Sequence, residues 1–228
     1  MRSRATASAD SLTGALIALE GIDGSGKSTI AKRLVEKLRE SGTSVILSRE
    51  PGGTAIGEQI REILLQQESL SMLPTTEMLL FAAARAQHVG ELVRPALAEG
   101  LTVVADRFVD SSLAYQWGGR GLEKRAVDLA IELATDGLEP DLRILLDLPV
   151  ESALRRRMAD WNETNRMDRE SIMFHGRVRD AYHSLVAADP ARWSVVDADR
   201  AVDDVSAAVW RAVVSRGLVG SDRGCFAL

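Results

Sequence analysis

The stretch LEGIDGSGKSTIAKRL, Leu19 to Leu34, decides how the rest of the chain is interpreted. From Gly21 to Ser28 it satisfies the pattern Gly-x-x-x-x-Gly-Lys-Ser/Thr at every fixed position. An apolar run precedes the loop and a helical pattern follows it, which is the context in which such loops bind phosphate. Glycines let successive backbone N–H groups point inward, and the following helix adds partial positive charge at its N-terminus. The stretch therefore predicts a site for nucleotide phosphates.

Two side chains of this loop have predicted roles. We expect Lys27 to bridge the β- and γ-phosphates and the Ser28 hydroxyl to help hold Mg²⁺. The predicted ATP-binding set is Gly21, Ile22, Asp23, Gly24, Ser25, Gly26, Lys27, Ser28 and Thr29. Such a loop fixes the donor but not the reaction, because GTPases, motor ATPases and small-molecule kinases all carry it. No Asn-Lys-x-Asp motif follows a strand, which disfavours a GTPase.

Five short apolar runs predict buried strands, because they are rich in Val, Ile and Leu without clean alternation. They span residues 15–20, 44–48, 101–106, 142–148 and 193–198. Helical spacing follows the glycine loop up to Gly42 and recurs over 56–65, 75–100 and 124–137; Pro95 is expected to kink or divide the segment 75–100. Strands alternating with helices predict an α/β fold, a five-stranded, parallel, doubly wound sheet.

Length and composition set the outer limits. The 228 residues, 46% of them hydrophobic, suit one core, and we expect a disordered leader over 1–13, a single P-loop domain over 14–214 and a flexible tail over 215–228. The formal charge of −5 argues against nucleic-acid and polybasic membrane binding. With one cysteine, Cys225, and no long apolar run or signal-like stretch, a reducing, cytoplasmic location is expected and no membrane partner.

Three further motifs stand at predicted strand or helix ends, where ligands of such sheets bind. They are REPGG (49–53), FAAAR (81–85) and DRFVDSSLAYQWGGRG (106–121). Phe81 and Arg85 are four residues apart, so they share a helix face and could stack on a planar base and hydrogen-bond its edge. Taken alone, the pair more often indicates a core phenylalanine beside a solvated arginine.

In this order and at these strand ends, the motifs make the chain resemble the bacterial thymidylate kinase family over about residues 15–210. The resemblance implies a nucleoside monophosphate kinase-like fold with a lid and a homodimer. It also implies ATP-dependent, Mg²⁺-assisted phosphorylation of dTMP to dTDP by direct in-line transfer. Two alternatives stay open: a P-loop kinase for another nucleoside monophosphate, and a catalytically inactive nucleotide-binding module that binds ATP without turnover.

The resemblance also implies roles for individual residues. Phe81 would stack on thymine and Arg85 would donate to a base carbonyl, while Arg107 would bind the acceptor 5′-phosphate. Asp23 would contact the sugar 3′-hydroxyl or the metal shell, and Asp106 would orient Arg107 or a Mg²⁺-bound water. Tyr115 would wall the deoxyribose. The implied acceptor set is Glu50, Pro51, Phe81, Arg85, Arg107, Ser111, Ser112, Tyr115 and Gln116, and the implied metal set is Ser28, Asp23 and Asp106.

Seven arginines between Pro149 and Tyr182 predict a lid over about 155–170 that closes on ATP. The P-loop carries no basic residue between its fixed glycines, so the chain resembles the family type that supplies a catalytic arginine from the lid. Arg166 matches that position best and joins Lys27, Asp23 and Arg107 in the implied catalytic set, with Arg155 and Arg157 as alternatives. Asn165 and Asp168 depart from the Asp and Glu usual in the family.

Overall fold

The computed structural model describes residues 13–66, 71–159 and 166–219. The predicted leader up to residue 12, the lid residues 160–165 and the tail from residue 220 lie outside the described residues.

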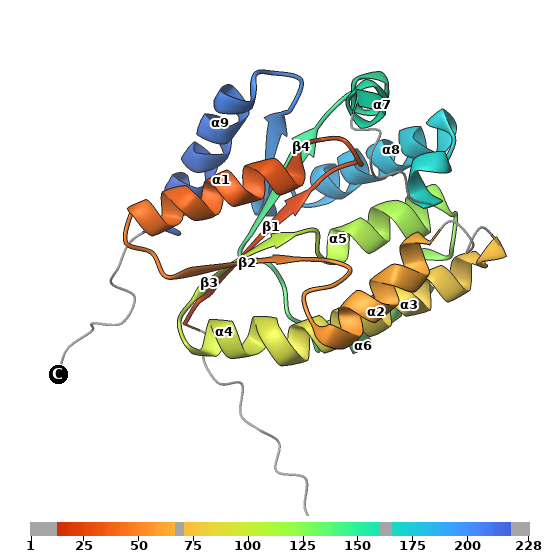
Figure 1. Ribbon diagram of the computed structural model, residues 1–228, viewed down its shortest axis with the longest axis horizontal. Helices are drawn as coiled ribbons and strands as arrows, with labels where there is room; N and C mark the ends of the chain where they lie inside the picture. Colours follow the sequence, from red (N-terminus) through yellow and green to blue (C-terminus); the bar gives the residue numbers. More distant parts are fainter. Residues whose placement is uncertain (1–12, 67–70, 160–165, 220–228) are drawn as a thin grey trace, which may run out of the picture.

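One parallel sheet organises the molecule and confirms the predicted fold class (Figure 1). Its five strands lie in the order β2-β3-β1-β4-β5. They are β1 (Ala15–Glu20), β2 (Val45–Arg49), β3 (Thr102–Asp106), β4 (Leu142–Asp147) and β5 (Trp193–Asp197), each within one residue of its predicted bounds. The glycine loop therefore leaves the central strand, and Leu19 pairs with Asp106 at the carboxyl edge of the sheet.

The side chains of β1 alternate between two cores, because successive residues of a strand point to opposite faces. Ala15, Ile17 and Leu19 pack in one core with residues of the helices α1 (Lys27–Glu40), α8 (Ile172–Ala188) and α9 (Val202–Ser215). Leu16 and Ala18 pack in the other with residues of α4 (Arg94–Ala98). Figure 1 shows the sheet between these two layers. Both faces are covered, which explains the near-continuous apolar strands.

The remaining helices lie around the carboxyl edge and the second face. They are α2 (Ala55–Leu65), α3 (Pro74–His88), α5 (Val109–Ser112), α6 (Lys124–Thr135) and α7 (Val150–Ala159), with short turns η4 (Arg166–Arg169) and η5 (Pro190–Arg192). Within the described residues, no helix is both long and apolar enough to cross a bilayer.

The segment expected as one helix over 75–100 is interrupted in the turn just before Pro95. Helix α3 ends at His88 and a π-helical segment, η2 (Val89–Val93), joins it to α4. Pro95 lies just after this π-helical segment and has no backbone N–H to donate to the preceding turn, which fits the change of hydrogen-bond register there.

A second π-helical segment, η3 (Leu113–Gly119), continues α5 and carries the predicted residues Tyr115 and Gln116. It packs directly on α8, because a Cβ at Gly119 would lie 2.6 Å from the ring of Phe174. Such segments add a residue to a helical turn and re-aim its side chains, and they are frequent at functional sites. Trp117 is partly buried here and packs against the first core.

Ordered structure continues past residue 214, where the domain was expected to end. Helix α9 runs to Ser215, and Leu218 is 7% exposed and packs in the first core. The apolar side chain at 218 therefore belongs to the folded unit.

Candidate active site

The glycine loop bends tightly between β1 and α1. Gly24 and Gly26 have φ values of 84° and 88°, which glycine adopts without strain. Lys27 is 6% exposed, and its Nζ donates to the Ile22 carbonyl at 2.9 Å and to Ser25 Oγ at 3.4 Å. Burial, with the nearby guanidinium of Arg107, lowers the pKa of Lys27 to about 8. The loop thus holds a cation in a poorly solvated position, ready for an anionic ligand.

Two of the three predicted metal ligands lie together. Ser28 Oγ donates to Asp106 Oδ2 at 2.5 Å, joining the start of α1 to the end of β3. A hydroxyl and a carboxylate beside a phosphate-binding loop are the hard oxygen donors that suit Mg²⁺. Asp23 is engaged elsewhere, and no cluster of three or more His, Cys, Asp or Glu suited to a metal occurs among the described residues.

Asp23 forms a compact unit with Arg107 and Tyr115. Arg107 Nη2 donates to Asp23 Oδ1 at 2.6 Å and to the Tyr115 hydroxyl at 3.1 Å, and that hydroxyl donates to Asp23 Oδ2 at 2.8 Å. Burial opposes ionisation, but Arg107 and Lys27 hold the pKa of Asp23 well below its usual range. Arg107 itself has φ 75°, a left-handed conformation that is costly for this residue and typical of functional sites.

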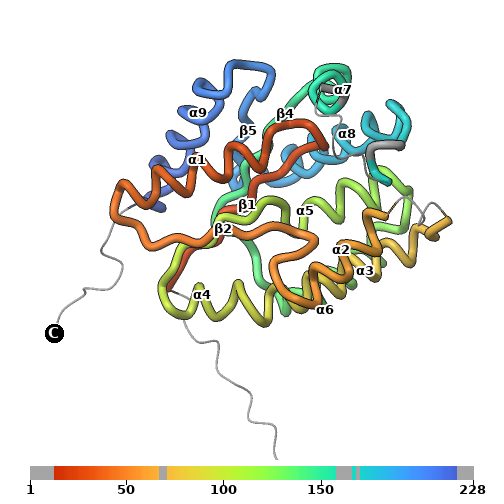
Figure 2. Tube along the Cα trace, in the orientation of Figure 1, coloured from red at the N-terminus to blue at the C-terminus, as the bar shows by residue number. Residues whose placement is uncertain are grey.

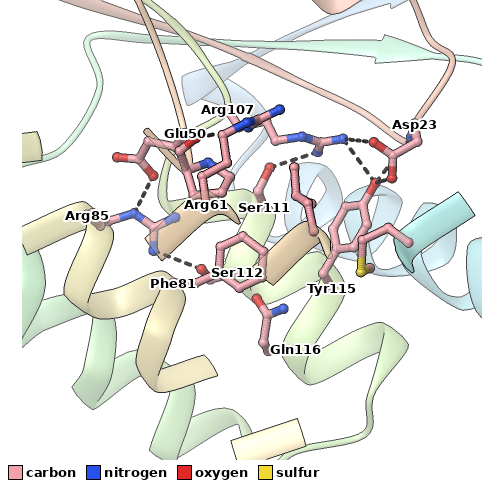
Figure 3. A pocket seen from close by; sticks show the side chains of 13 residues that line it. Asp23, Glu50, Arg61, Phe81, Arg85, Arg107, Ser111, Ser112, Tyr115 and Gln116 are labelled. Carbon is pink, nitrogen blue, oxygen red and sulfur yellow. Dashed lines mark hydrogen bonds and ion pairs between the residues drawn. The ribbon is translucent and has the colours of Figure 1, made fainter. Parts of the chain in front are cut away.

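All nine residues predicted for the acceptor line one cavity (Figure 3). They are Glu50, Pro51, Phe81, Arg85, Arg107, Ser111, Ser112, Tyr115 and Gln116, from the three motifs at 49–53, 81–85 and 106–121. Phe81 is half-buried at the cavity wall and belongs to neither core cluster. This placement favours the ligand-binding interpretation of Phe81 over the core interpretation.

Arg85 is 2% exposed, so it is not the solvated charge that the FAAAR motif also allowed. Its Nε donates to Glu50 Oε2 at 2.7 Å, and its two Nη groups donate to Ser112 Oγ at 2.8 Å and the Phe108 carbonyl at 3.0 Å. His88 lies 2.8 Å from the other oxygen of Glu50. Burial opposes ionisation of Glu50, yet Arg85 and His88 lower its pKa. Glu50 therefore anchors Arg85 at the wall.

A cleft of about 650 Å³ adjoins the P-loop. Of the nine predicted ATP-binding residues, six line it: Asp23, Gly24, Gly26, Lys27, Ser28 and Thr29. The other three, Gly21, Ile22 and Ser25, belong to the same loop but are buried. The Ile22 carbonyl and Ser25 Oγ accept hydrogen bonds from Lys27.

Arg166 lies away from the P-loop cleft, in contrast to the expectation from the lid motif. It is 4% exposed, and its Nη2 donates to Glu77 Oε2 at 2.6 Å while its Nε donates to the Leu64 carbonyl at 3.0 Å. The buried carboxylate of Glu77 binds this guanidinium instead. Arg157, one of the two alternatives, lines the P-loop cleft with Arg156. Arg155, the other, donates to Ser152 Oγ at 2.8 Å.

Sequence reasoning missed Arg61 and Glu20. Arg61 lines both cavities and donates to the Pro51 carbonyl at 2.9 Å; its sequence signal is weak, a lone arginine in the helix after REPGG. Glu20 is fully buried and accepts from Phe108 N, Ser111 Oγ and Tyr182 OH at 2.9, 2.6 and 2.8 Å. Burial, reinforced by Asp110, raises the pKa of Glu20 to about 7. The sequence signal that could have indicated Glu20 is a glutamate at the end of an apolar strand.

A phosphate-binding loop on the central strand of this sheet, opening beside a cavity with an aromatic wall and an arginine, defines a P-loop kinase of the nucleoside monophosphate kinase type. Comparison with known proteins narrows the class. The model of the thymidylate kinase family matches residues 19–209, and the chain belongs to this family.

Curated relatives match over most of the chain. The thymidylate kinase of Thermomicrobium roseum is 50% identical over 197 residues, covering 86% of this chain and 93% of the relative. Those of Geobacter sulfurreducens and Geotalea uraniireducens are 47% and 46% identical over 208 residues, each covering 89% of this chain and 98% of the relative.

Proposed function

We propose that this chain transfers the γ-phosphoryl group of ATP to the 5′-phosphate of dTMP, giving ADP and dTDP. One observation carries the proposal beyond the family: the P-loop cleft and the acceptor cavity share four lining residues, Asp23, Glu50, Arg61 and Arg107. A donor phosphate on the loop and an acceptor phosphate in the cavity would therefore meet at this shared wall.

At that wall, an oxygen of the acceptor phosphate attacks the γ-phosphorus while the bond to the ADP oxygen breaks in line. The step needs positioning and positive charge more than a covalent protein group. Lys27 and the loop amides hold the donor, and Arg107 and Arg61 supply charge where the two phosphates approach. Mg²⁺, held beside Ser28 and Asp106, would neutralise donor phosphate charge when bound.

On the acceptor side, Phe81 stacks on the base and Arg85, which can only donate, hydrogen-bonds a base carbonyl. Tyr115 is fixed by Asp23 and Arg107, with the Arg107 guanidinium 4.9 Å from its ring centroid. That fixed ring supports its role as the wall of the sugar pocket. Asp23 would accept a hydrogen bond from the sugar 3′-hydroxyl.

The test is an ADP-release assay over dTMP, dCMP, dAMP and dGMP. We expect turnover of dTMP to exceed that of each other acceptor by orders of magnitude. Preference for another nucleotide would overturn the proposal in favour of a different monophosphate kinase, and ATP binding without turnover would favour the inactive module.

The proposal includes a homodimer through α2, α3 and α6. These helices carry exposed apolar side chains, among them Leu79 (57%), Leu129 (54%) and Leu133 (88%). A second copy of the chain would cover them. The lone cysteine supports a reducing, cytoplasmic setting.

A further inference from the structure

Behind the acceptor cavity lies a carboxylate that the proposed reaction does not use. Glu77, in α3, is 1% exposed and does not line the cavity. Its Oε1 accepts from Gln116 Nε2 at 2.9 Å and Arg120 Nε at 3.0 Å, and its Oε2 accepts from Nη2 of Arg120 at 2.9 Å and Nη2 of Arg166 at 2.6 Å.

We propose that Glu77 is a positioning residue that sets which end of the Gln116 amide faces the acceptor base, and thereby selects the pyrimidine. The inference rests on the proposed function, because it deepens the base recognition assigned to that cavity.

The amide orientation follows from hydrogen-bond chemistry. An ionised carboxylate can only accept, so the amide that contacts it must turn its NH₂ group toward Glu77. Gln116 is 1% exposed and lines the cavity, so its Oε1 is the end presented there. Figure 3 shows this oxygen directed toward the ring of Phe81 and the nitrogen directed away.

The charge state of Glu77 is fixed by its partners. Burial opposes ionisation, but the hydrogen bonds and charges of Arg120, together with Gln116 and Arg166, lower the pKa of Glu77 below its usual value. The carboxylate therefore stays an acceptor at neutral pH. This arrangement also accounts for Arg166, whose neighbour Met167 lines the same cavity.

A presented carbonyl discriminates between pyrimidines. Thymine and uracil carry an N–H at position 3, which can donate to Gln116 Oε1, whereas cytosine carries an unprotonated N3 that can only accept. Two acceptors facing each other in a buried site leave both unsatisfied, which disfavours dCMP. Arg85 supplies a donor on the same wall, matching the 4-carbonyl of thymine rather than the 4-amino group of cytosine.

The variant Glu77→Gln should reverse the orientation of the Gln116 amide. Arg120 Nη2 and Arg166 Nη2 both donate to Oε2, so the oxygen of the new amide should stay there. Its NH₂ group then takes the place of Oε1 and faces Gln116, whose amide flips to present its oxygen. We expect kcat/KM for dTMP to fall at least tenfold relative to dCMP, roughly the effect of one mismatched buried hydrogen bond. The KM for ATP should not change. A folded Glu77→Gln protein with an unaltered dTMP:dCMP ratio would overturn the proposal.

Asp110→Asn is the matched control, because Asp110 forms another buried pair, with Arg143 at 2.8 Å, and does not line the cavity. It should lower the melting temperature and preserve the dTMP:dCMP ratio. An equal change of the dTMP:dCMP ratio in both variants would show that loss of any buried ion pair nearby alters selectivity, and it would overturn the inference.

If Glu77→Gln does not fold, exchange of the Gln116 side-chain NH₂ protons, measured by NMR on the wild-type protein, decides the question. Slow exchange without ligand, unchanged by dTMP, supports the bond to Glu77, and fast exchange contradicts it. A wild-type protein that does not prefer dTMP to dCMP would instead refute the proposed function, before any variant is compared.

Discussion

Lys27 is a buried cation held by two uncharged oxygens, the carbonyl of Ile22 and the hydroxyl of Ser25. It lines the P-loop cleft and not the acceptor cavity. We therefore expect its charge to act on donor phosphates. Two properties of the protein should then depend on Lys27 separately: the rate of phosphoryl transfer and the proton uptake that accompanies ATP binding.

The first prediction concerns the rate. Lys27→Ala should lower kcat by at least about 100-fold, the order seen when one preorganised charge stabiliser is lost. Binding of dTMP should be nearly unchanged, because the acceptor cavity keeps all its lining residues. Steady-state kinetics and calorimetric titration with dTMP measure the two effects, and a matching loss of dTMP affinity would contradict the donor-side role.

The second prediction concerns the uptake of protons when ATP binds. Since burial and Arg107 lower the pKa of Lys27 to about 8, part of the population is neutral above that pH, and a bound phosphate favours the charged form. ATP binding about one pH unit above 8 should therefore take up protons, and the uptake should vanish at lower pH, where Lys27 is already charged. Calorimetry in buffers of different ionisation enthalpy detects it. Lys27→Met should abolish it, and an equal uptake in that variant would assign it elsewhere.

Among the elements, α7 and η4 flank the predicted lid and line different cavities. Residues of α7 line the P-loop cleft, whereas Met167 of η4 lines the acceptor cavity. Helix α7 lies against the loop, since a Cβ at Gly24 would lie 2.5 Å from the Ala153 carbonyl, and both traces show α7 above the start of α1 (Figures 1 and 2). Turn η4 instead holds Arg166 against α3 through Glu77. We therefore expect α7 to supply the lid-side arginine that, with Arg61 and Arg107, acts on the transferred phosphoryl.

Arg157→Ala should accordingly lower kcat at least tenfold with little change in KM for dTMP, because an arginine at the transferring group stabilises charge in the transition state. Arg155→Ala, two residues earlier on the same helix and bonded to Ser152, is the control and should stay within about threefold. Arg166→Ala should raise KM for dTMP. A collapse of kcat in Arg166→Ala with little effect in Arg157→Ala would restore the role that the lid motif first indicated.

The contact between η3 and α8 gives a stability prediction. Gly119→Ala places a methyl group 2.6 Å from Phe174, and overpacking of this kind costs about 1–3 kcal/mol. Gly176→Ala, within α8 and with no neighbouring atom within 4 Å, should stabilise by about 0.5–1 kcal/mol through helix propensity. Urea unfolding measures both free energies. Equal effects at the two positions would refute the close packing.

Local signals predicted much of this architecture. The strands are predicted by continuous apolar runs such as ALIALE, which are typical of strands covered on both faces. Spacing places Phe81 and Arg85 on one helix face, but their assignment to the acceptor rests on the resemblance to the family. The contact of Arg166 with Glu77 could not be predicted, because Glu77 lies 89 residues earlier and no local spacing encodes that pairing. The π-helical turn of η3 and the burial of Glu20 likewise depend on tertiary packing.

For the whole molecule, the apolar surface of α2, α3 and α6 predicts a dimer. Leu133 is 88% exposed, so Leu133→Asp should not unfold the subunit but should shift it to a monomer in sedimentation velocity. Met173→Asp, at a 74% exposed position on α8, is the control and should leave the dimer intact. A wild-type monomer, or a dimer that survives Leu133→Asp, would contradict this interface.

The central claim is that a phosphoryl group crosses the wall shared by the two cavities, from ATP to dTMP. It is tested most directly by following the label from γ-phosphoryl-labelled ATP in the presence of dTMP and Mg²⁺. The label should be recovered in the β-phosphate of dTDP, in amounts equal to the ADP formed, and not when dCMP replaces dTMP. Label released as inorganic phosphate, or passed to dCMP as readily as to dTMP, would contradict it.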